Sequence, residues 1–217
     1  VYTYQAWAML HGHLWMRPAD LGIEAFMHAG HAYTYFGIFP SILRLPFAAV
    51  FHLHGNSNYT EGSMLLSWVV TGVFTAMLTW RLRLLVRGRA ALGRMEAAAY
   101  GLLVFSVLAG SVVLYLGAMP WIYNEDFAWA IALSIAVYWS LLGVIDRPSW
   151  GRVSVTGLLI LFASLNRLTA GWACIIAALA VAGWFWFSPK QREKRRFVIP
   201  MVVAGLIPLI VSSWINY

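Results

Sequence analysis

Residues 127–145 read FAWAIALSIAVYWSLLGVI, a run without a single charged side chain. About 20 mostly apolar residues are needed for a helix to cross the hydrocarbon core of a bilayer, so this run predicts a membrane-spanning helix. The whole chain of 217 residues is 61% hydrophobic and only 11% charged, whereas soluble domains carry about 25% charged residues. The composition therefore indicates a membrane protein and excludes a surface exposed to water on all sides.

Comparable apolar runs predict six spans, at 63–80, 97–119, 127–145, 153–165, 169–187 and 197–215. The fourth run is short, but joining it to the fifth would make one helix of about 50 Å, far longer than a core of about 30 Å requires. We therefore expect a hairpin that turns near Asn166 and Arg167. The prediction is an all-α polytopic membrane protein with a loop over residues 1–62 and a bundle over residues 63–217.

The charged residues predict the orientation of these spans. Twelve of the 15 basic residues fall in three alternate loops, within 81–94, 147–152 and 190–196. The positive-inside rule places these loops in the cytoplasm, and residues 1–62 on the other side of a plasma (inner) membrane. Five of the 8 acidic residues also fall on that other side. The net charge of +7 is thus explained by topology and needs no nucleic-acid partner, while the lipid bilayer is the expected one.

The loop over residues 1–62 contains further expected elements. Residues 2–14 are rich in Tyr, Trp and Met and predict a helix that lies in the membrane interface. Aromatic residues alternate between glycines at 30–41, which suggests a short extended segment. Residues 40–53 are apolar but interrupted by Arg44 and Pro46, so we expect a re-entrant or interfacial segment, followed by a polar loop at 55–60.

Several ionisable residues in the expected outer loops could carry chemistry. Glu125 and Asp126 can act as a base or hold a divalent cation, or they can simply favour the start of a helix. Asp20 and Glu24 are four residues apart and would share a helix face. Arg167 follows a span too short to reach the surface, so we expect a recessed guanidinium that pairs with an acid or binds a lipid-linked phosphate.

The six histidines form three pairs, and the chain has a single cysteine, Cys174. His28 and His31, spaced to share a helix face, and Glu125 are weak candidates for metal ligands. No histidine lies in the middle of a predicted span, so haem is not expected, and the single cysteine excludes a cysteine-based zinc site.

At this point the pattern resembles the GT-C superfamily of integral membrane glycosyltransferases, whose bacterial members use polyprenyl-phosphate sugars. Members have a long first extracytoplasmic loop with juxtamembrane helices and a Gly–Tyr–x–Tyr–Phe–Gly–x–x–Pro–Ser signature. The matching residues here are Tyr33, Tyr35, Phe36, Gly37, Pro40 and Ser41. Later outer elements of the family resemble three further segments, at 123–125, 166–167 and 216–217. The chain starts in the middle of an apolar-aromatic run and looks like part of a longer protein.

The resemblance implies transfer of a sugar from a polyprenyl-phosphate donor to an extracytoplasmic acceptor. It implies a catalytic role for Glu125 and substrate binding by Arg167, Tyr33 and Tyr35. The adjacent Asp126 is a further catalytic candidate, and Asp20 and Glu24 are further candidates for substrate binding, although they do not occupy the place of the family's carboxylate. A divalent metal ion is a cofactor compatible with this reaction, and no nucleotide cofactor is expected. The family's main catalytic carboxylate sits at the start of the first loop, which corresponds to a position before Val1.

Two other classes of function have the same hydropathy pattern. A transporter or flippase would carry acids or broken helices near the middle of the membrane, and the predicted spans carry no acidic residue. A non-catalytic subunit of a larger membrane complex is the second alternative.

The predicted orientation can be tested by cysteine labelling from outside intact cells. A cysteine at position 56 should react with an impermeant reagent, whereas cysteines placed in residues 81–94 or 190–196 should not, because both loops are expected in the cytoplasm. Reaction of residues 81–94 from outside would overturn the topology.

Overall fold

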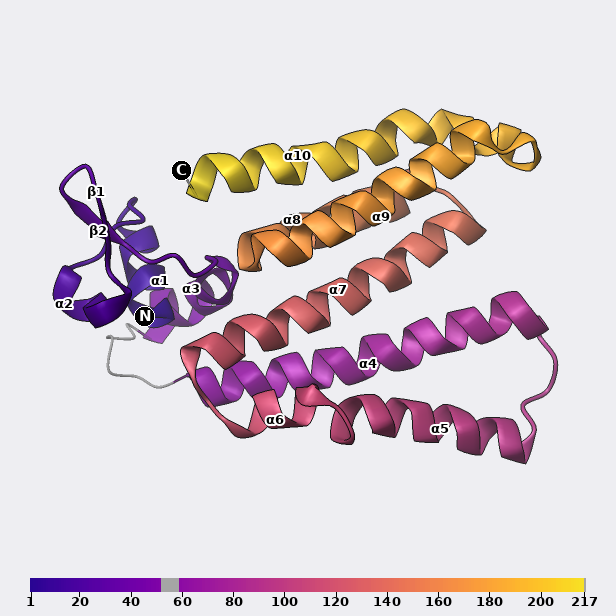
Figure 1. Cartoon of the computed structure of the whole chain (residues 1–217), viewed down its shortest axis with the longest axis horizontal. Helices are drawn as coiled ribbons and strands as arrows, with labels where there is room; N and C mark the ends of the chain where they lie inside the picture. The colour runs from indigo at the N-terminus through magenta and orange to yellow at the C-terminus, as the bar shows by residue number, and fades with distance from the viewer. Residues whose placement is uncertain (52–58, 217) are drawn as a thin grey trace.

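The structure is a computed structural model that describes residues 1–51 and 59–216. It has two parts, a bundle of long helices and a smaller N-terminal region at one end of that bundle (Figure 1). The bundle consists of α4 (Thr60–Arg87), α5 (Arg94–Ala109), α6 (Val112–Ala118), α7 (Ile122–Asp146), α8 (Trp150–Asn166), α9 (Leu168–Phe187), the 3-10 segment η2 (Pro189–Phe197) and α10 (Val198–Asn216).

Among the described residues, four helices are long and apolar enough to cross a membrane: α4, α7, α9 and the continuous stretch of η2 and α10. A fifth span results if α5 and α6 are counted as one. The helix α8 is apolar but shorter, as its short run predicted. The prediction of an all-α polytopic membrane protein is therefore confirmed, and the chain is a multi-pass membrane protein.

The span predicted over residues 97–119 is not one continuous helix. The chain bends by 44° between α5 and α6. The helix α5 ends at Ala109 and is followed by Gly110, and Ser111 starts α6 by accepting a hydrogen bond from the Val113 amide. Serine is a favoured residue at a helix start, and Ser111 has an extended backbone, so the second helix starts anew at this residue.

The predicted hairpin over residues 153–187 is confirmed. The helix α8 ends at Asn166, and Arg167 has an extended backbone before α9 begins. The two helices approach closely here, because a Cβ atom added to Gly171 would lie 2.6 Å from the Ser164 Cα atom. Small residues at such positions let the backbones of membrane helices pack directly against each other.

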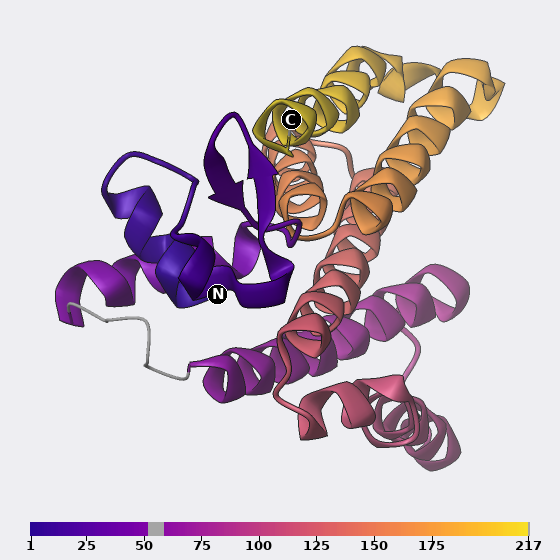
Figure 2. The ribbon, with the colours of Figure 1, turned by 60° about the vertical axis from the view of Figure 1, so that its left-hand side comes forward.

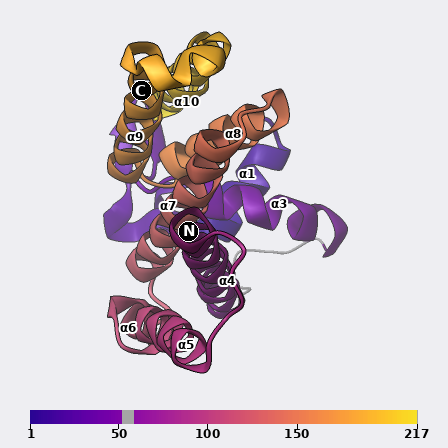
Figure 3. The same cartoon turned by 90° about the vertical axis from the view of Figure 1, so that its right-hand side faces the viewer.

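The helix α7 is the centre of the bundle. Seen along the helices, α4, α5 and α6 lie on one side of it and α8, α9 and α10 on the other (Figure 3). Its apolar stretch is 61% buried, compared with 22% for α4. A helix that is apolar all round is expected to be buried, and this explains why residues 127–145 occupy the core.

The three basic loops gather at one end of the bundle. Near the end of α7, Lys194 donates to the Ile145 carbonyl (2.5 Å) and Arg152 to the Gly143 carbonyl (2.8 Å). Arg81 donates to the nearby Trp139 carbonyl (2.6 Å). Cations favour the carboxyl end of a helix. The N-terminal region lies at the opposite end (Figure 2). The charge separation that the sequence predicted is therefore present, and the cytoplasmic location of the basic end stays a prediction.

The N-terminal region comprises α1 (Tyr2–Leu10), α2 (Pro18–Leu21), the 3-10 turn η1 (Gly22–Glu24), a hairpin of β1 (Phe26–His28) and β2 (His31–Tyr33), and α3 (Phe39–Phe51). The helices α1 and α3 pack together, and the Ser41 hydroxyl donates to the Gln5 side chain (2.6 Å). The extended segment expected at 30–41 is limited to β2, because α3 already begins at Phe39. The polar loop expected at 55–60 lies mostly in residues 52–58, outside those described.

The close approach in the α8–α9 hairpin generates a prediction about two glycines of α9. Gly171→Ala should destabilise the protein by about 1–3 kcal/mol, because the added methyl group overpacks against Ser164. Gly183→Ala is the matched control, since no atom lies within 4 Å of its added Cβ and alanine favours a helix by about 1 kcal/mol over glycine. Thermal unfolding in nanodiscs should show opposite shifts, and equal shifts would contradict the tight hairpin.

Candidate functional site

A buried ion pair joins the N-terminal region to the bundle. Arg44 of α3 donates from Nη1 to Oε1 of Glu125 (2.7 Å) and from Nη2 to Oε2 (3.0 Å), with Glu125 in the first turn of α7. Their side chains are 5% and 0% exposed. Arg44 Nη1 also donates to the Pro40 carbonyl (2.9 Å). This two-bond geometry is the strong form of an arginine–carboxylate pair, so it fixes both the distance and the rotation of α3 against α7.

A second ion pair lies next to the first. Arg167 Nη1 donates to Asp126 Oδ2 (2.9 Å), and the neighbouring Asn166 side chain donates to the Asp126 backbone carbonyl (2.8 Å). The Arg167 guanidinium carbon also lies 3.8 Å from the centre of the Phe127 ring. The sequence was compatible with several partners for Arg167, and in the structure its partner is Asp126. The Arg167 side chain is 36% exposed, so part of its guanidinium stays accessible to a ligand.

Glu24 forms a third group at the same end of α7. Tyr35 and Tyr123 both donate to its carboxylate, the latter at 2.6 Å, and their hydroxyl oxygens are 2.7 Å apart. Both hydrogen bonds lower the pKa of Glu24, and the bond from Tyr123 has the larger effect. The bond to Glu24 in turn raises the pKa of Tyr35. Glu24 is thus held as a carboxylate, and this stabilising contact is lost only as the pH falls below the usual range of a glutamate.

Tyr2 lies among the charges of both ion pairs. Its ring centre is 5.3 Å from the guanidinium carbon of Arg44. The pKa of Tyr2 is raised well above its ordinary value, mainly because the hydroxyl is buried and secondly because Asp126 and Glu125 are negatively charged. In the described part of the chain, four buried atoms in this group have no hydrogen-bond partner: the Tyr2 hydroxyl, Arg44 Nε, Asp126 Oδ1 and Asn166 Oδ1. Such atoms are uncommon in folded proteins and often mark a site.

Gly37 brings the segment after β2 directly onto the end of α8. A Cβ atom at this position would lie 1.8 Å from the Asn166 carbonyl oxygen, so only glycine allows the approach. The preceding Phe36 packs edge-on against Tyr123, with ring centres 5.0 Å apart. Segments 35–37, 123–126 and 166–167 therefore meet at one place. We call this place the interface site and define it by Glu24, Tyr35, Arg44, Tyr123, Glu125, Asp126 and Arg167.

Two of the predicted substrate-binding residues lie outside the interface site. Tyr33 packs against His28 within the hairpin. Asp20 pairs with Arg17 (2.9 Å). The expectation that Asp20 and Glu24 share a helix face is wrong, because α2 ends at Leu21 and the chain turns through Gly22, which has a positive φ of 59°. Glycine tolerates this backbone conformation, and it ends the helix.

The weak metal candidates do not come together as one group. His28 and His31 face each other across the hairpin rather than sharing a helix face, and both oxygens of Glu125 bond to Arg44. Within residues 1–51 and 59–216, no group of three or more His, Cys, Asp or Glu side chains could hold a metal ion. His52 and His54, the third pair, fall outside the described residues.

Sequence reasoning missed Arg44 and the hydroxyl of Tyr123 as parts of the site. The signal for Arg44 was present, since it is a cation within an apolar segment, as Arg167 is. Such a residue needs an acidic partner or a wet cavity. Its partner Glu125 lies 81 positions further along the chain, and nothing in the local sequence pairs the two.

No protein-family model, curated protein or solved structure matches this chain. Its function therefore has to be inferred from the residues of the interface site.

The buried ion pair generates a stability prediction. Arg44→Ala should destabilise the protein by about 3–5 kcal/mol, because Glu125 is left buried without a counter-charge. The double variant Arg44→Met with Glu125→Leu should recover most of this loss, since it removes both charges.

Arg17→Ala is the control for these variants. It breaks the pair with Asp20, in which the Arg17 side chain is 76% exposed, and should cost less than about 1 kcal/mol. Thermal unfolding in nanodiscs measures all three variants. An Arg44→Ala protein as stable as the parent would contradict the role of the pair.

Proposed function

We propose that this chain acts as a GT-C-type membrane glycosyltransferase, which transfers a sugar from a polyprenyl-phosphate donor to an acceptor at the interface site. The observation that carries the proposal is the meeting of three segments, 35–37, 123–126 and 166–167, around Asn166 and Tyr123. These are segments of the sequence that resemble outer elements of that superfamily. The first and second segments are more than 80 positions apart in the sequence, and the second and third are about 40 apart. Local sequence therefore does not bring them together.

Arg167 is the residue that would bind the donor phosphate. Its planar guanidinium can form paired hydrogen bonds with phosphate oxygens. The bond from Nη1 to Asp126 holds one nitrogen of the group, and 36% of the Arg167 side chain stays exposed. In this proposal Asp126 is a positioning residue that orients Arg167, rather than the group that abstracts a proton.

Glu125 is also a positioning residue in this proposal. Both of its oxygens bond to Arg44 and its side chain is fully buried, so it holds α3 against α7 rather than reaching an acceptor. Glu24 is the accessible carboxylate of the site. Because its pKa is lowered, it is a weak base and is better suited to accept hydrogen bonds from sugar hydroxyls. The base that the resemblance implies is not one of the residues of the interface site.

The reaction then has one bond-forming and one bond-breaking event. An acceptor hydroxyl oxygen, losing its proton to the base, forms a bond to the anomeric carbon of the donor. The bond between that carbon and the phosphate oxygen breaks, and the polyprenyl phosphate leaves with an additional negative charge. The fixed guanidinium of Arg167 stabilises this charge as it develops.

Binding of a polyprenyl phosphate in nanodiscs tests the role of Arg167. Arg167→Lys should keep the charge that pairs with Asp126, so the unfolding temperature should stay close to that of the parent. The lysine loses the planar fork, however, so the affinity for polyprenyl phosphate should fall several-fold. Arg167→Ala should lower the affinity at least tenfold, about 1.4 kcal/mol.

Arg147→Ala is the matched control, because Arg147 is an exposed arginine (76%) at the opposite end of α7. It should bind polyprenyl phosphate as the parent does. Unchanged binding by a stably folded Arg167→Lys protein and by Arg167→Ala would remove the phosphate role and leave a structural ion pair with Asp126.

A further inference from the structure

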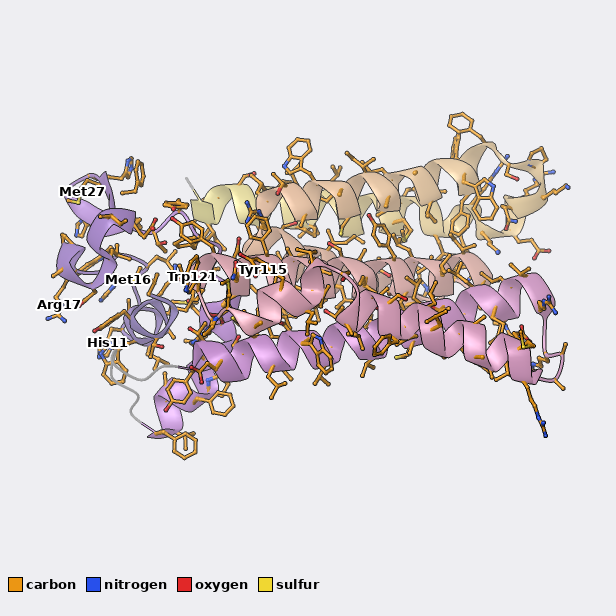
Figure 4. The ribbon with its side chains drawn as sticks, turned by 60° about the horizontal axis from the view of Figure 1, so that its bottom comes forward. His11, Met16, Arg17, Met27, Tyr115 and Trp121 are labelled. Atoms are coloured by element: carbon orange, nitrogen blue, oxygen red, sulfur yellow. The ribbon has the colours of Figure 1, made fainter. Side chains whose placement is uncertain are left out.

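The N-terminal region contains an open cleft that shares no residue with the interface site. Its volume is about 480 Å³, within the range of about 300–1,000 Å³ that small-molecule sites have. Figure 4 shows three of its lining residues, His11, Met16 and Arg17, together in the N-terminal region, away from Trp121 at the end of the bundle.

One face of α1 forms a wall of this cleft. Tyr4, Trp7, Ala8 and His11 line it, and their spacing of three, four and seven residues places them on the same side of a helix. The other side of α1 packs on α3 through Gln5 and the buried Ala6. The helix α1 is therefore held from behind while its aromatic side chains face the cleft.

Two pairs of an indole and an imidazole line the cleft. The rings of Trp7 and His11 are 4.8 Å apart, His13 stacks on Trp15 at 4.0 Å, and His31 lies 4.8 Å from the Trp15 ring. The lining residues Ala8 and Met16 are buried, and the Met16 amide donates to the Ala32 carbonyl (2.8 Å). This arrangement brings His11 and His13 to the same cleft, because α1 ends at Leu10 and the chain turns back between them.

Both imidazoles are oriented by the backbone. His11 Nδ1 bonds to the Trp7 carbonyl (2.8 Å) and His13 Nδ1 to the Trp15 carbonyl (2.8 Å). A carbonyl oxygen only accepts hydrogen bonds, so each Nδ1 is the donor and the neutral ring keeps Nε2 as an acceptor. Two fixed acceptors therefore accompany the aromatic walls.

The charges of the cleft cancel. Arg17 donates from Nε and Nη2 to the two oxygens of Asp20 (2.9 and 3.0 Å), so the positive and negative groups at the rim neutralise each other. A free cation or anion gains little from such a pair. A neutral ligand with many hydroxyl groups can use both, since guanidinium donates and carboxylate accepts.

We propose that this cleft is a binding site for a neutral saccharide. Sugar rings have an apolar C–H face, which packs on indole and imidazole rings, and a rim of hydroxyls, which bonds to imidazole nitrogens and to an arginine–aspartate pair. The proposal goes beyond the transfer reaction and does not require it, because no cleft residue belongs to the interface site.

Saturation-transfer NMR with maltose, cellobiose and lactose tests the proposal on the full chain. Nanodiscs are required, because the headgroup of maltoside detergents would itself compete for the cleft. At least one disaccharide should give a signal with the parent protein. Trp7→Ala and Asp20→Asn should each weaken its binding at least tenfold, and Trp186→Ala, an exposed indole near the basic end, should leave it unchanged.

Trp15→Ala, which removes an exposed ring, supplies a second test if Trp7→Ala lowers the unfolding temperature. Arg167→Ala should keep disaccharide binding, which separates this cleft from the donor site. Three results would each overturn the proposal. The parent protein could give no signal with any of the three sugars, the cleft variants could give the same signals as the parent, or the cleft could bind choline chloride in preference to the sugars.

Discussion

The buried pair of Arg44 and Glu125 is the interaction on which the arrangement of the molecule depends. It joins a short helix near the start of the chain to the first turn of the central span, and both side chains are almost completely removed from solvent. A buried pair of this kind need not add net stability, because the loss of hydration offsets much of the attraction. It does impose specificity, since any other placement of α3 would leave an uncompensated charge in an apolar environment.

The start of α7 makes contacts to three different parts of the molecule through three side chains. Tyr123 bonds to Glu24, Glu125 to Arg44 and Asp126 to Arg167. Acidic residues also suit the amino end of a helix, where the helix dipole is positive, so the capping explanation and the pairing explanation are compatible. Because the three side chains leave the helix in different directions, a single turn holds the hairpin region, α3 and the α8–α9 turn together. Within this arrangement part of the Arg167 side chain stays exposed.

The N-terminal region uses its two sides for different purposes. One side carries the buried contacts to the bundle, and the other carries the aromatic cleft with its neutral Arg17–Asp20 pair. The helix α1 connects them, since Tyr2 lies beside Arg44 while Trp7 and His11 line the cleft. A ligand held in the cleft would therefore contact a region whose position depends on one ion pair.

The sequence by itself determined the membrane class, the α8–α9 hairpin and the separation of charge between the two ends, because these depend on local hydropathy and on residues close together in the chain. It also identified Glu125, Asp126, Arg167, Tyr35 and Glu24 as residues of interest. Only the tertiary structure decided their partners. The bonds from Arg44 to Glu125 and from Tyr123 to Glu24 join residues 81 and 99 positions apart, and which acid neutralises which arginine depends on helix packing. The break at Gly110 and the turn at Gly22 were likewise missed, because glycine ends a helix only where the surrounding structure does not favour its continuation.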